Sequence, residues 1–250
     1  MASTAETGHA KNVANLKKLI SKCIGYGARY NPTNNLIKIP NMQSVQIASA
    51  TSLTTVNTTR APYTQAVNTR SPLFQEMEKL AGRAKNALDA TENVEDNLVE
   101  DAMTYLRKIR GARKNKIDVP PPPADSTAIE IAKQISVSQQ SYDQQVQHFS
   151  KLRTLLASVL VYMPNETELQ PAQLLTTENQ LIAANDAVTA AATPYTNALQ
   201  SRDNVMYAKK TGLVDIALEA KNYVKSVKTI TPAEFRQISG LTFRRPPKKK

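Results

Sequence analysis

Apolar residues recur every three or four positions over long parts of the chain, which is the pattern of amphipathic α-helices. Two long helices are predicted, over 127–161 and 173–207, and three shorter ones over 11–24, 213–227 and 231–239. The apolar stripe of the first long helix consists of Ile131, Ile135, Tyr142, Val146, Phe149, Leu152, Leu156 and Val159. Glycine is scarce, with seven residues in 250, which also favours helices over turn-rich β architectures.

Several residues mark the expected helix ends. Thr231 and Glu234 have the spacing of a capping box and flank a proline, so the last helix should begin there. Pro164 should end the first long helix, because proline removes a backbone hydrogen bond and clashes with the preceding turn. For the same reason Pro62 and Pro194 should kink or restart the helices that contain them.

One segment occurs twice with the same order of residue types. PYTQAVNTR at 62–70 matches PYTNALQSR at 194–202, 132 positions later. Weaker matches follow in order: Tyr30 and Pro32 with Tyr162 and Pro164, Lys18-Leu19 with Lys151-Leu152, 87–90 with 217–220 after a two-residue slip, and 107–111 with 236–240. The series predicts a tandem duplication of a helical-bundle unit, with the two copies related by a pseudo-twofold axis.

The repeat also decides an ambiguous segment. Residues 47–59 (IASATSLTTVNTT) are rich in Thr, Val and Ser and taken alone would indicate a strand. Their counterpart at 180–192 (QLIAANDAVTAAA) is a strong helix former. Two copies of one fold share a structure, so both segments are predicted to be helical.

These features divide the chain into five parts. We expect a mobile N-terminal tail at 1–10, a first helical unit at 11–111, a basic and proline-rich linker at 112–126, a second helical unit at 127–243 and a basic C-terminal tail at 244–250. The linker contains four consecutive prolines, which favour a stiff, extended polyproline II spacer.

The net charge of +11 lies in two short segments. Without their eleven basic residues, the 32 Lys and Arg of the chain fall to 21, which equals the number of Asp and Glu. Such clusters can bind phosphates, or they can be solvated segments that aid solubility. The anion-binding candidates are Arg107, Lys108, Arg110, Arg113, Lys114, Lys116, Arg244, Arg245, Lys248, Lys249 and Lys250.

Arg70 and Arg202 occupy matching positions on apolar helix stripes. A charge on such a stripe must reach water or pair with a carboxylate, because an unpaired buried charge is costly. Structural ion pairs are the favoured interpretation and a ligand-binding pair is the alternative. Asp89 and Glu219 are the expected partners, since they also match between the repeats.

No pattern of catalytic, cofactor-binding or metal-binding residues is found in the sequence. The two histidines, His9 and His148, and the single cysteine, Cys23, do not form a cluster with ligand spacing. Cys23 is expected in the core of the first helix and His148 on a helix surface. We therefore predict no enzyme activity, no cofactor and no metal. The polar N-terminus lacks a signal-peptide core and no apolar run could span a membrane, so a cytoplasmic location is expected.

The chain resembles an uncharacterised family of bacterial helical-bundle proteins. The likeness is carried by PYTNALQSR at 194–202, ALEAKNYV at 217–224 and FRQISGL at 235–241, and it extends over most of the chain from about residue 55. The resemblance implies a helical fold and no known activity, ligand or partner.

Two functions are compatible with these features. The favoured one is a non-enzymatic structural or scaffold protein that self-associates, as a homo-oligomer or filament, or organises partners through its long helices. The alternative is a protein that binds nucleic acid or another acidic surface nonspecifically through the two basic segments.

Overall fold

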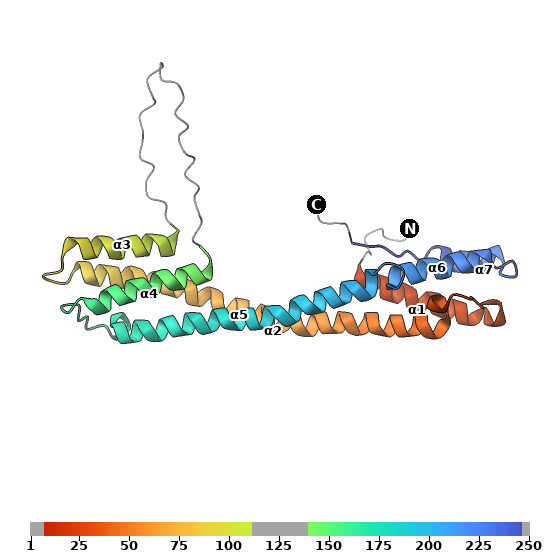
Figure 1. Cartoon of the computed structure of the whole chain (residues 1–250), viewed down its shortest axis with the longest axis horizontal. Helices are drawn as coiled ribbons and strands as arrows, with labels where there is room; N and C mark the ends of the chain where they lie inside the picture. Colours follow the sequence, from red (N-terminus) through yellow and green to blue (C-terminus); the bar gives the residue numbers. More distant parts are fainter. Residues whose placement is uncertain (1–7, 112–139, 247–250) are drawn as a thin grey trace, which may run out of the picture. The chain divides into compact units, whose positions relative to one another are not determined.

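The part of the chain that the structure describes is mostly helical. The computed structural model describes residues 8–111 and 140–246, which contain no β-strand. The α-helices are α1 (His9–Gly25), α2 (Ile39–Asp89), α3 (Asp96–Arg110), α4 (Tyr142–Ser158), α5 (Pro171–Tyr207), α6 (Leu213–Ser226) and α7 (Pro232–Ser239) (Figure 1). Three short 3-10 helices are η1 (Gly27–Arg29), η2 (Asn35–Ile37) and η3 (Thr167–Leu169). The prediction of an all-α fold is confirmed.

Some predicted segments lie outside the described residues. These are most of the N-terminal tail, the whole linker at 112–126, the first part of the helix predicted over 127–161, and the last four residues of the basic C-terminal tail.

The helices form two compact units. The terminal unit combines residues up to Thr64 with those from Ala191 onward, and the central unit is Gln65–Ala190. Each long helix contributes to both: the first part of α2 and the last part of α5 belong to the terminal unit, and their remaining parts to the central unit. The structure thus groups the chain differently from the contiguous units predicted at 11–111 and 127–243. The reason is the length of α2, whose 51 residues contribute side chains to both units.

Each unit has its own apolar core. In the terminal unit α1 contributes Leu16, Leu19 and Cys23, which are fully buried among side chains of α6. In the central unit Phe149 and Leu152 of α4 are fully buried with side chains of α2, α3 and α5. The core position predicted for Cys23 is confirmed, and burial raises the pKa of its thiol to about 12.

Local features recur at the repeat spacing found in the sequence. Helices α1 and α4 both have 17 residues, and η3 and α5 begin 132 positions after η2 and α2. The hydroxyl of Tyr30 donates to the carbonyl of Ile37 at 2.7 Å, and that of Tyr162 donates to the carbonyl of Leu169 at 3.0 Å. These correspondences support the predicted duplication, which remains a prediction about the origin of the chain.

The buried positions correct one detail of the repeat alignment. Residues 81, 82, 84, 85 and 88 are buried, and so are 213, 214, 216, 217 and 220, at a constant offset of 132. The two-residue slip that pairs 87–90 with 217–220 is therefore wrong in structural terms: Leu88 is fully buried whereas Leu218 is 43% exposed.

The helix ends follow the predicted signals in part. At α7 the side chain of Thr231 accepts from the backbone of Glu234 and the Glu234 carboxylate accepts from the backbone of Thr231, so the capping box is confirmed. The segment 47–59 lies within α2, also as predicted. Pro62 and Pro194 do not restart their helices, since α2 and α5 continue through them.

Candidate functional site

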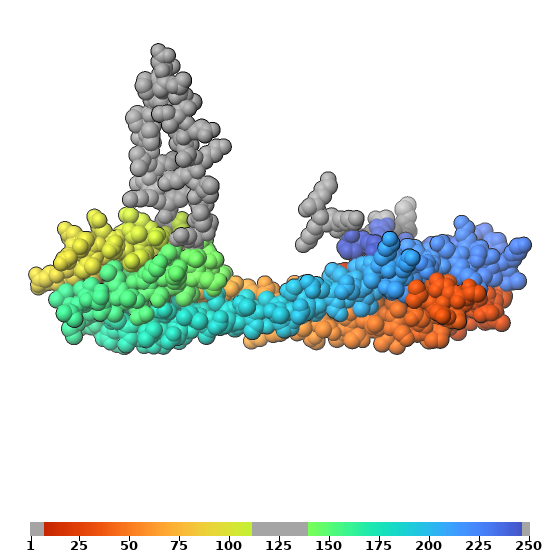
Figure 2. All heavy atoms as spheres, viewed as in Figure 1, coloured from red at the N-terminus to blue at the C-terminus, as the bar shows by residue number. Residues whose placement is uncertain are grey.

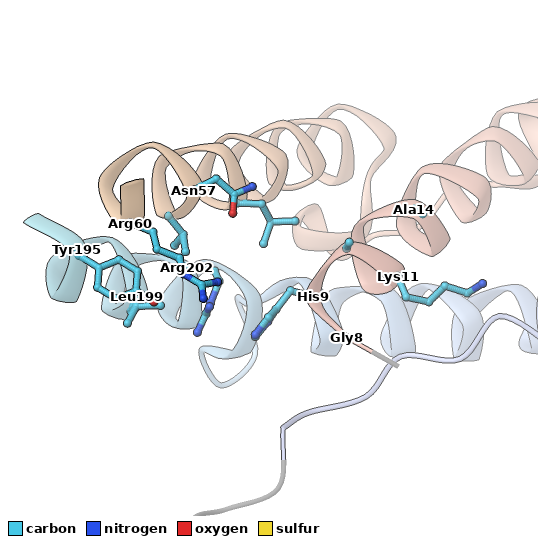
Figure 3. Close-up of a pocket in the computed structure, with 12 residues that line it drawn as sticks. Gly8, His9, Lys11, Ala14, Asn57, Arg60, Tyr195, Leu199 and Arg202 are labelled. Atoms are coloured by element: carbon cyan, nitrogen blue, oxygen red, sulfur yellow. The ribbon is translucent and has the colours of Figure 1, made fainter. Parts of the chain in front are cut away.

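A groove on the terminal unit lies beside several basic residues. We call it the α1 groove: it has a volume of about 710 Å³ and is open to solvent (Figure 3). The first residues of α1 form one side, α2 the second and α5 the third. Its lining consists of Gly8, His9, Ala10, Lys11, Ala14, Leu53, Val56, Asn57, Arg60, Tyr195, Leu199 and Arg202.

The lining of the α1 groove is basic and contains no acidic residue. Arg60 of α2 and Arg202 of α5 point into the groove, whereas the side chain of Lys11 extends away from them (Figure 3). Arg202 is mostly buried, with a side chain 15% exposed, and pairs with the neighbouring carboxylate of Asp203 at 2.7 Å. Arg60 is exposed. The groove therefore offers guanidinium groups from two helices beside an apolar wall.

His9 lies at the edge of the α1 groove. Its Nδ1 is 2.8 Å from the hydroxyl of Tyr207, and the two rings are in contact. Burial lowers the pKa of His9, as does the Arg202 guanidinium, and the carboxylate of Asp203 opposes them. The neutral imidazole is thus the form that this environment favours.

Arg70, the counterpart of Arg202, sits in a polar network of the central unit, and its Nε is buried without a hydrogen-bond partner. Its Nη1 donates to Oδ1 of Asn185 at 3.1 Å, and the guanidinium lies 3.7 Å from the ring centre of Tyr142. Asn185 in turn donates to Oδ1 of Asp143 at 2.8 Å. Arg70 is therefore held by an amide and an aromatic ring, with the nearest carboxylate one step away.

The partners predicted for the two arginines are wrong. Asp89 pairs instead with Lys85, one turn away on α2, at 2.9 Å. Glu219 accepts a hydrogen bond from the amide of Asn34 at 3.1 Å. The two-residue slip that pairs Asp89 with Glu219 is not present in the fold. At the constant spacing of 132 the counterpart of Asp89 is Lys221, so the two acids do not occupy matching positions.

The first basic segment is only partly described. Arg107 and Lys108 are exposed near the end of α3, and Nε of Arg110 lies 3.4 Å from the carboxylate of Glu78. Arg113, Lys114 and Lys116 lie outside the described residues. Arg107 and Lys108 remain candidates for anion contact, and Arg110 is shared with an acidic partner.

The start of the second basic segment is packed on the terminal unit. The side chain of Asn12 accepts from the backbone amide of Arg244 at 3.1 Å and donates to its carbonyl at 2.8 Å. Arg245 pairs with Asp215 at 2.6 Å, and its other terminal nitrogen donates to the carbonyl of Tyr207. The first two residues of the predicted basic tail are thus packed on the unit, because buried amides of α1 need the backbone as a partner. Lys248, Lys249 and Lys250 are not described.

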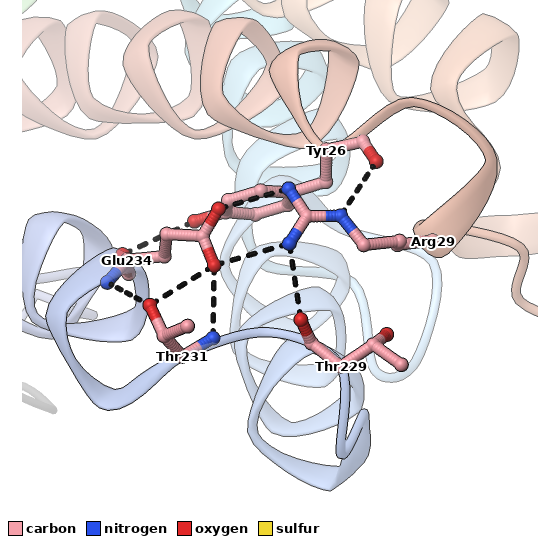
Figure 4. Close-up of polar contacts among 5 residues, drawn as sticks. All are labelled: Tyr26, Arg29, Thr229, Thr231 and Glu234. Atoms are coloured by element: carbon pink, nitrogen blue, oxygen red, sulfur yellow. Dashed lines mark hydrogen bonds and ion pairs between the residues drawn. The ribbon is translucent and has the colours of Figure 1, made fainter.

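A second polar cluster joins α7 to the segment after α1. Arg29 donates to both carboxylate oxygens of Glu234, at 2.8 and 3.1 Å, and to the carbonyl of Thr229 (Figure 4). The same carboxylate accepts from Thr231 in the capping box. The Arg29 hydrogen bond, followed by that of Thr231, lowers the pKa of Glu234 to about 2. This cluster fixes one end of the terminal unit.

Other expected features are placed as follows. His148, expected on a helix surface, is only 2% exposed, and burial lowers its pKa. Within 8–111 and 140–246, no group of three or more His, Cys, Asp and Glu residues could hold a metal ion. None of the helices described there is long and apolar enough to cross a membrane.

One stretch of the central unit exposes large apolar side chains. Of eight such side chains among the described residues, five lie between residues 160 and 182: Leu160, Val161, Met163, Leu175 and Ile182. Leu160 is 91% and Met163 82% exposed. Both belong to the loop between α4 and η3, and atoms of this stretch, coloured green to turquoise, are visible at the surface in Figure 2. We call Leu160–Ile182 the apolar stretch.

No family model, curated protein or solved structure matches the chain. The features of the sites above are therefore judged from their geometry. Sequence reasoning identified Arg202 but missed Arg29, Arg60 and His9 as site residues. Their partners lie in distant parts of the chain, so no local spacing could have indicated them.

Proposed function

We propose that the protein is a non-enzymatic structural or scaffold protein that self-associates or organises partners through its long helices. The apolar stretch is the observation that carries this proposal. Leu160 and Met163 expose most of their apolar surface to water, and burying each in an interface would contribute roughly 1.5–3 kcal/mol. Exposed apolar surface is a common feature of association sites, and five of the eight large exposed apolar side chains of the described residues fall in this one stretch of sequence.

The proposal is tested by measuring the mass in solution. Size-exclusion chromatography with light scattering should give an assembly larger than 27.5 kDa that persists at high salt. The double variant Leu160→Lys, Met163→Lys should shift it to a monomer, because two charges replace the apolar contacts. A matched control, Asn165→Lys with Gln173→Lys, adds the same charge at exposed polar positions and should leave the assembly intact. A monomer at both salt concentrations for the unmodified chain would contradict self-association.

A second candidate function is nonspecific binding of nucleic acid or another acidic surface. Its support is the exposure of Arg107 and Lys108, which follow one another at the end of α3. Binding of this kind weakens steeply with salt, whereas apolar packing does not. Nucleic acid that co-elutes at low salt and is released at high salt would favour this second function over the first.

A further inference from the structure

The two units surround the matching arginines, Arg70 and Arg202, with different side chains. At the repeat spacing, Arg202 corresponds to Arg70 and Leu53 to Asn185, 132 positions apart, and His9 and Ala10 correspond to Tyr142 and Asp143, 133 positions apart. In the central unit these side chains form the Arg70–Asn185–Asp143 network, and the ring of Tyr142 lies against Arg70. In the terminal unit Leu53 and Ala10 cannot form it, because they carry no polar side-chain atom.

The α1 groove lies at these positions, where Ala10 and His9 are smaller than their counterparts Asp143 and Tyr142. Ala10 and Leu53 line it together with Arg202, in the place where the central unit has a carboxylate and an amide. Arg60 adds a second guanidinium, at a position whose counterpart 132 residues later is Ala192. At these positions the terminal unit therefore has no acid or amide, has the same arginine as the central unit, and has a second arginine.

We propose that the α1 groove binds a small organic anion, with its phosphate or carboxylate group between Arg60 and Arg202 and its apolar part against Leu53, Val56 and Leu199. Guanidinium groups form charge-assisted, often bidentate hydrogen bonds with such anions. The apolar wall provides the rest of the contact, as in most small-molecule sites. This inference is independent of the proposed scaffold function.

The charges around the site define its chemistry. The carboxylate of Asp203 is half exposed and accepts hydrogen bonds from Nε and one terminal nitrogen of Arg202. The ligand must share Arg202 with this carboxylate. Removing the competing charge in Asp203→Asn should therefore strengthen binding of the anion, while a new acid in the groove should weaken it.

Binding can be followed at the two histidines of the full chain. Phenyl phosphate is the probe, with inorganic phosphate in parallel, and the ring signals of His9 and His148 are recorded by carbon–proton NMR during each titration. His9 lines the groove, whereas His148 is buried in the central unit and serves as an internal control. Phenyl phosphate should shift the His9 signals at lower concentration than inorganic phosphate and leave those of His148 unchanged.

Variants test whether the charge of the α1 groove, rather than its shape, determines binding of phenyl phosphate. Arg60→Gln and Arg202→Gln should each weaken phenyl phosphate binding by about tenfold, the loss expected for one charge-assisted hydrogen bond. Arg236→Gln removes the same charge from an exposed site on α7 and should have little effect. Ala10→Asp should abolish binding, whereas the neutral Ala10→Asn should retain it. Circular dichroism of each variant verifies the helical fold.

Several results would overturn the proposal. Equal shifts of the His9 and His148 signals would do so, as would the absence of a His9 shift at millimolar phenyl phosphate. So would equal changes of the affinity for phenyl phosphate in Ala10→Asp and Ala10→Asn. Inorganic phosphate binding as tightly as phenyl phosphate would refute the organic class of ligand, because the apolar wall would then contribute nothing.

Discussion

At the residue scale, Glu234 links two segments of the terminal unit that are far apart in sequence. It accepts hydrogen bonds from Arg29 and also completes the capping box of α7. The capping box was predictable, because Thr231 and Glu234 are three positions apart. Arg29 was not, because it lies 205 positions from Glu234 and nothing local marks it as a partner.

The pKa of Glu234 gives a test at this scale. Its folded-state pKa of about 2 is below the ordinary value of 4.5, so the stabilisation is present above pH 4.5 and is lost as the pH falls toward 2. Glu234→Gln should lower the melting temperature at pH 7 and flatten its dependence on pH in this range. Thermal unfolding followed by circular dichroism measures both.

A matched variant serves as the control for Glu234. Glu92→Gln removes an exposed carboxylate from the loop after α2 and should reproduce the pH dependence of the unmodified chain. If Glu234→Gln retained the full loss of stability between pH 4.5 and 2, other carboxylates would be responsible for it.

At the scale of elements, the helices were predictable where local signals mark them. α5, α6 and α7 begin and end within two residues of their predictions, because an apolar stripe, a proline or a cap lies at each boundary. The full length of α2 was not predicted, and α5 continues through Pro194, where a kink or restart was expected. A proline removes one hydrogen bond, and the turns on either side remain fixed by packing and by their own hydrogen bonds, so the helix continues.

Pro194 should therefore weaken α5 at one point. Pro194→Ala restores a backbone hydrogen bond and should stabilise the protein, by up to about 3 kcal/mol if the helix geometry is otherwise unchanged. Pro232→Ala is the matched control: Pro232 is in the first turn of α7, where proline is favourable, so its removal should not stabilise. Urea unfolding of both variants measures the difference, and equal effects would contradict a helix-interior cost at Pro194.

At the scale of the whole molecule, the grouping of helices into units was the least predictable feature. The repeat at 62–70 and 194–202 indicated two similar parts, and the natural expectation was that each part folds on itself. Whether a helix packs with its own repeat or with the other depends on contacts such as those of Tyr26 with Glu234 and Asn31 with Tyr223, which the one-dimensional pattern does not contain.

Because each unit has its own core, a mutation in one core should destabilise that unit and leave the other unchanged. Leu16→Ala should destabilise the terminal unit by about 2–5 kcal/mol, and Phe149→Ala the central unit by about 3–5 kcal/mol. Amide hydrogen exchange read by mass spectrometry should then rise in α1 and α6 for the first variant and in α3 and α4 for the second. A rise in all four helices for either variant would show that the units unfold together.

The two units differ in when their parts are synthesised, because one is continuous in sequence and the other is not. The central unit is continuous from Gln65 to Ala190, so the ribosome delivers all of it before the last 60 residues exist. Helix α1 is synthesised before the central unit but can pack with α6 and α7 only after it, since Tyr26 and Glu234 are 208 positions apart. At about 5–20 residues per second this delay is roughly 10–40 s. During that time the apolar face of α1 is accessible to chaperones. A chain terminated before Ala191 contains the complete central unit, together with an α1 that lacks its later partners.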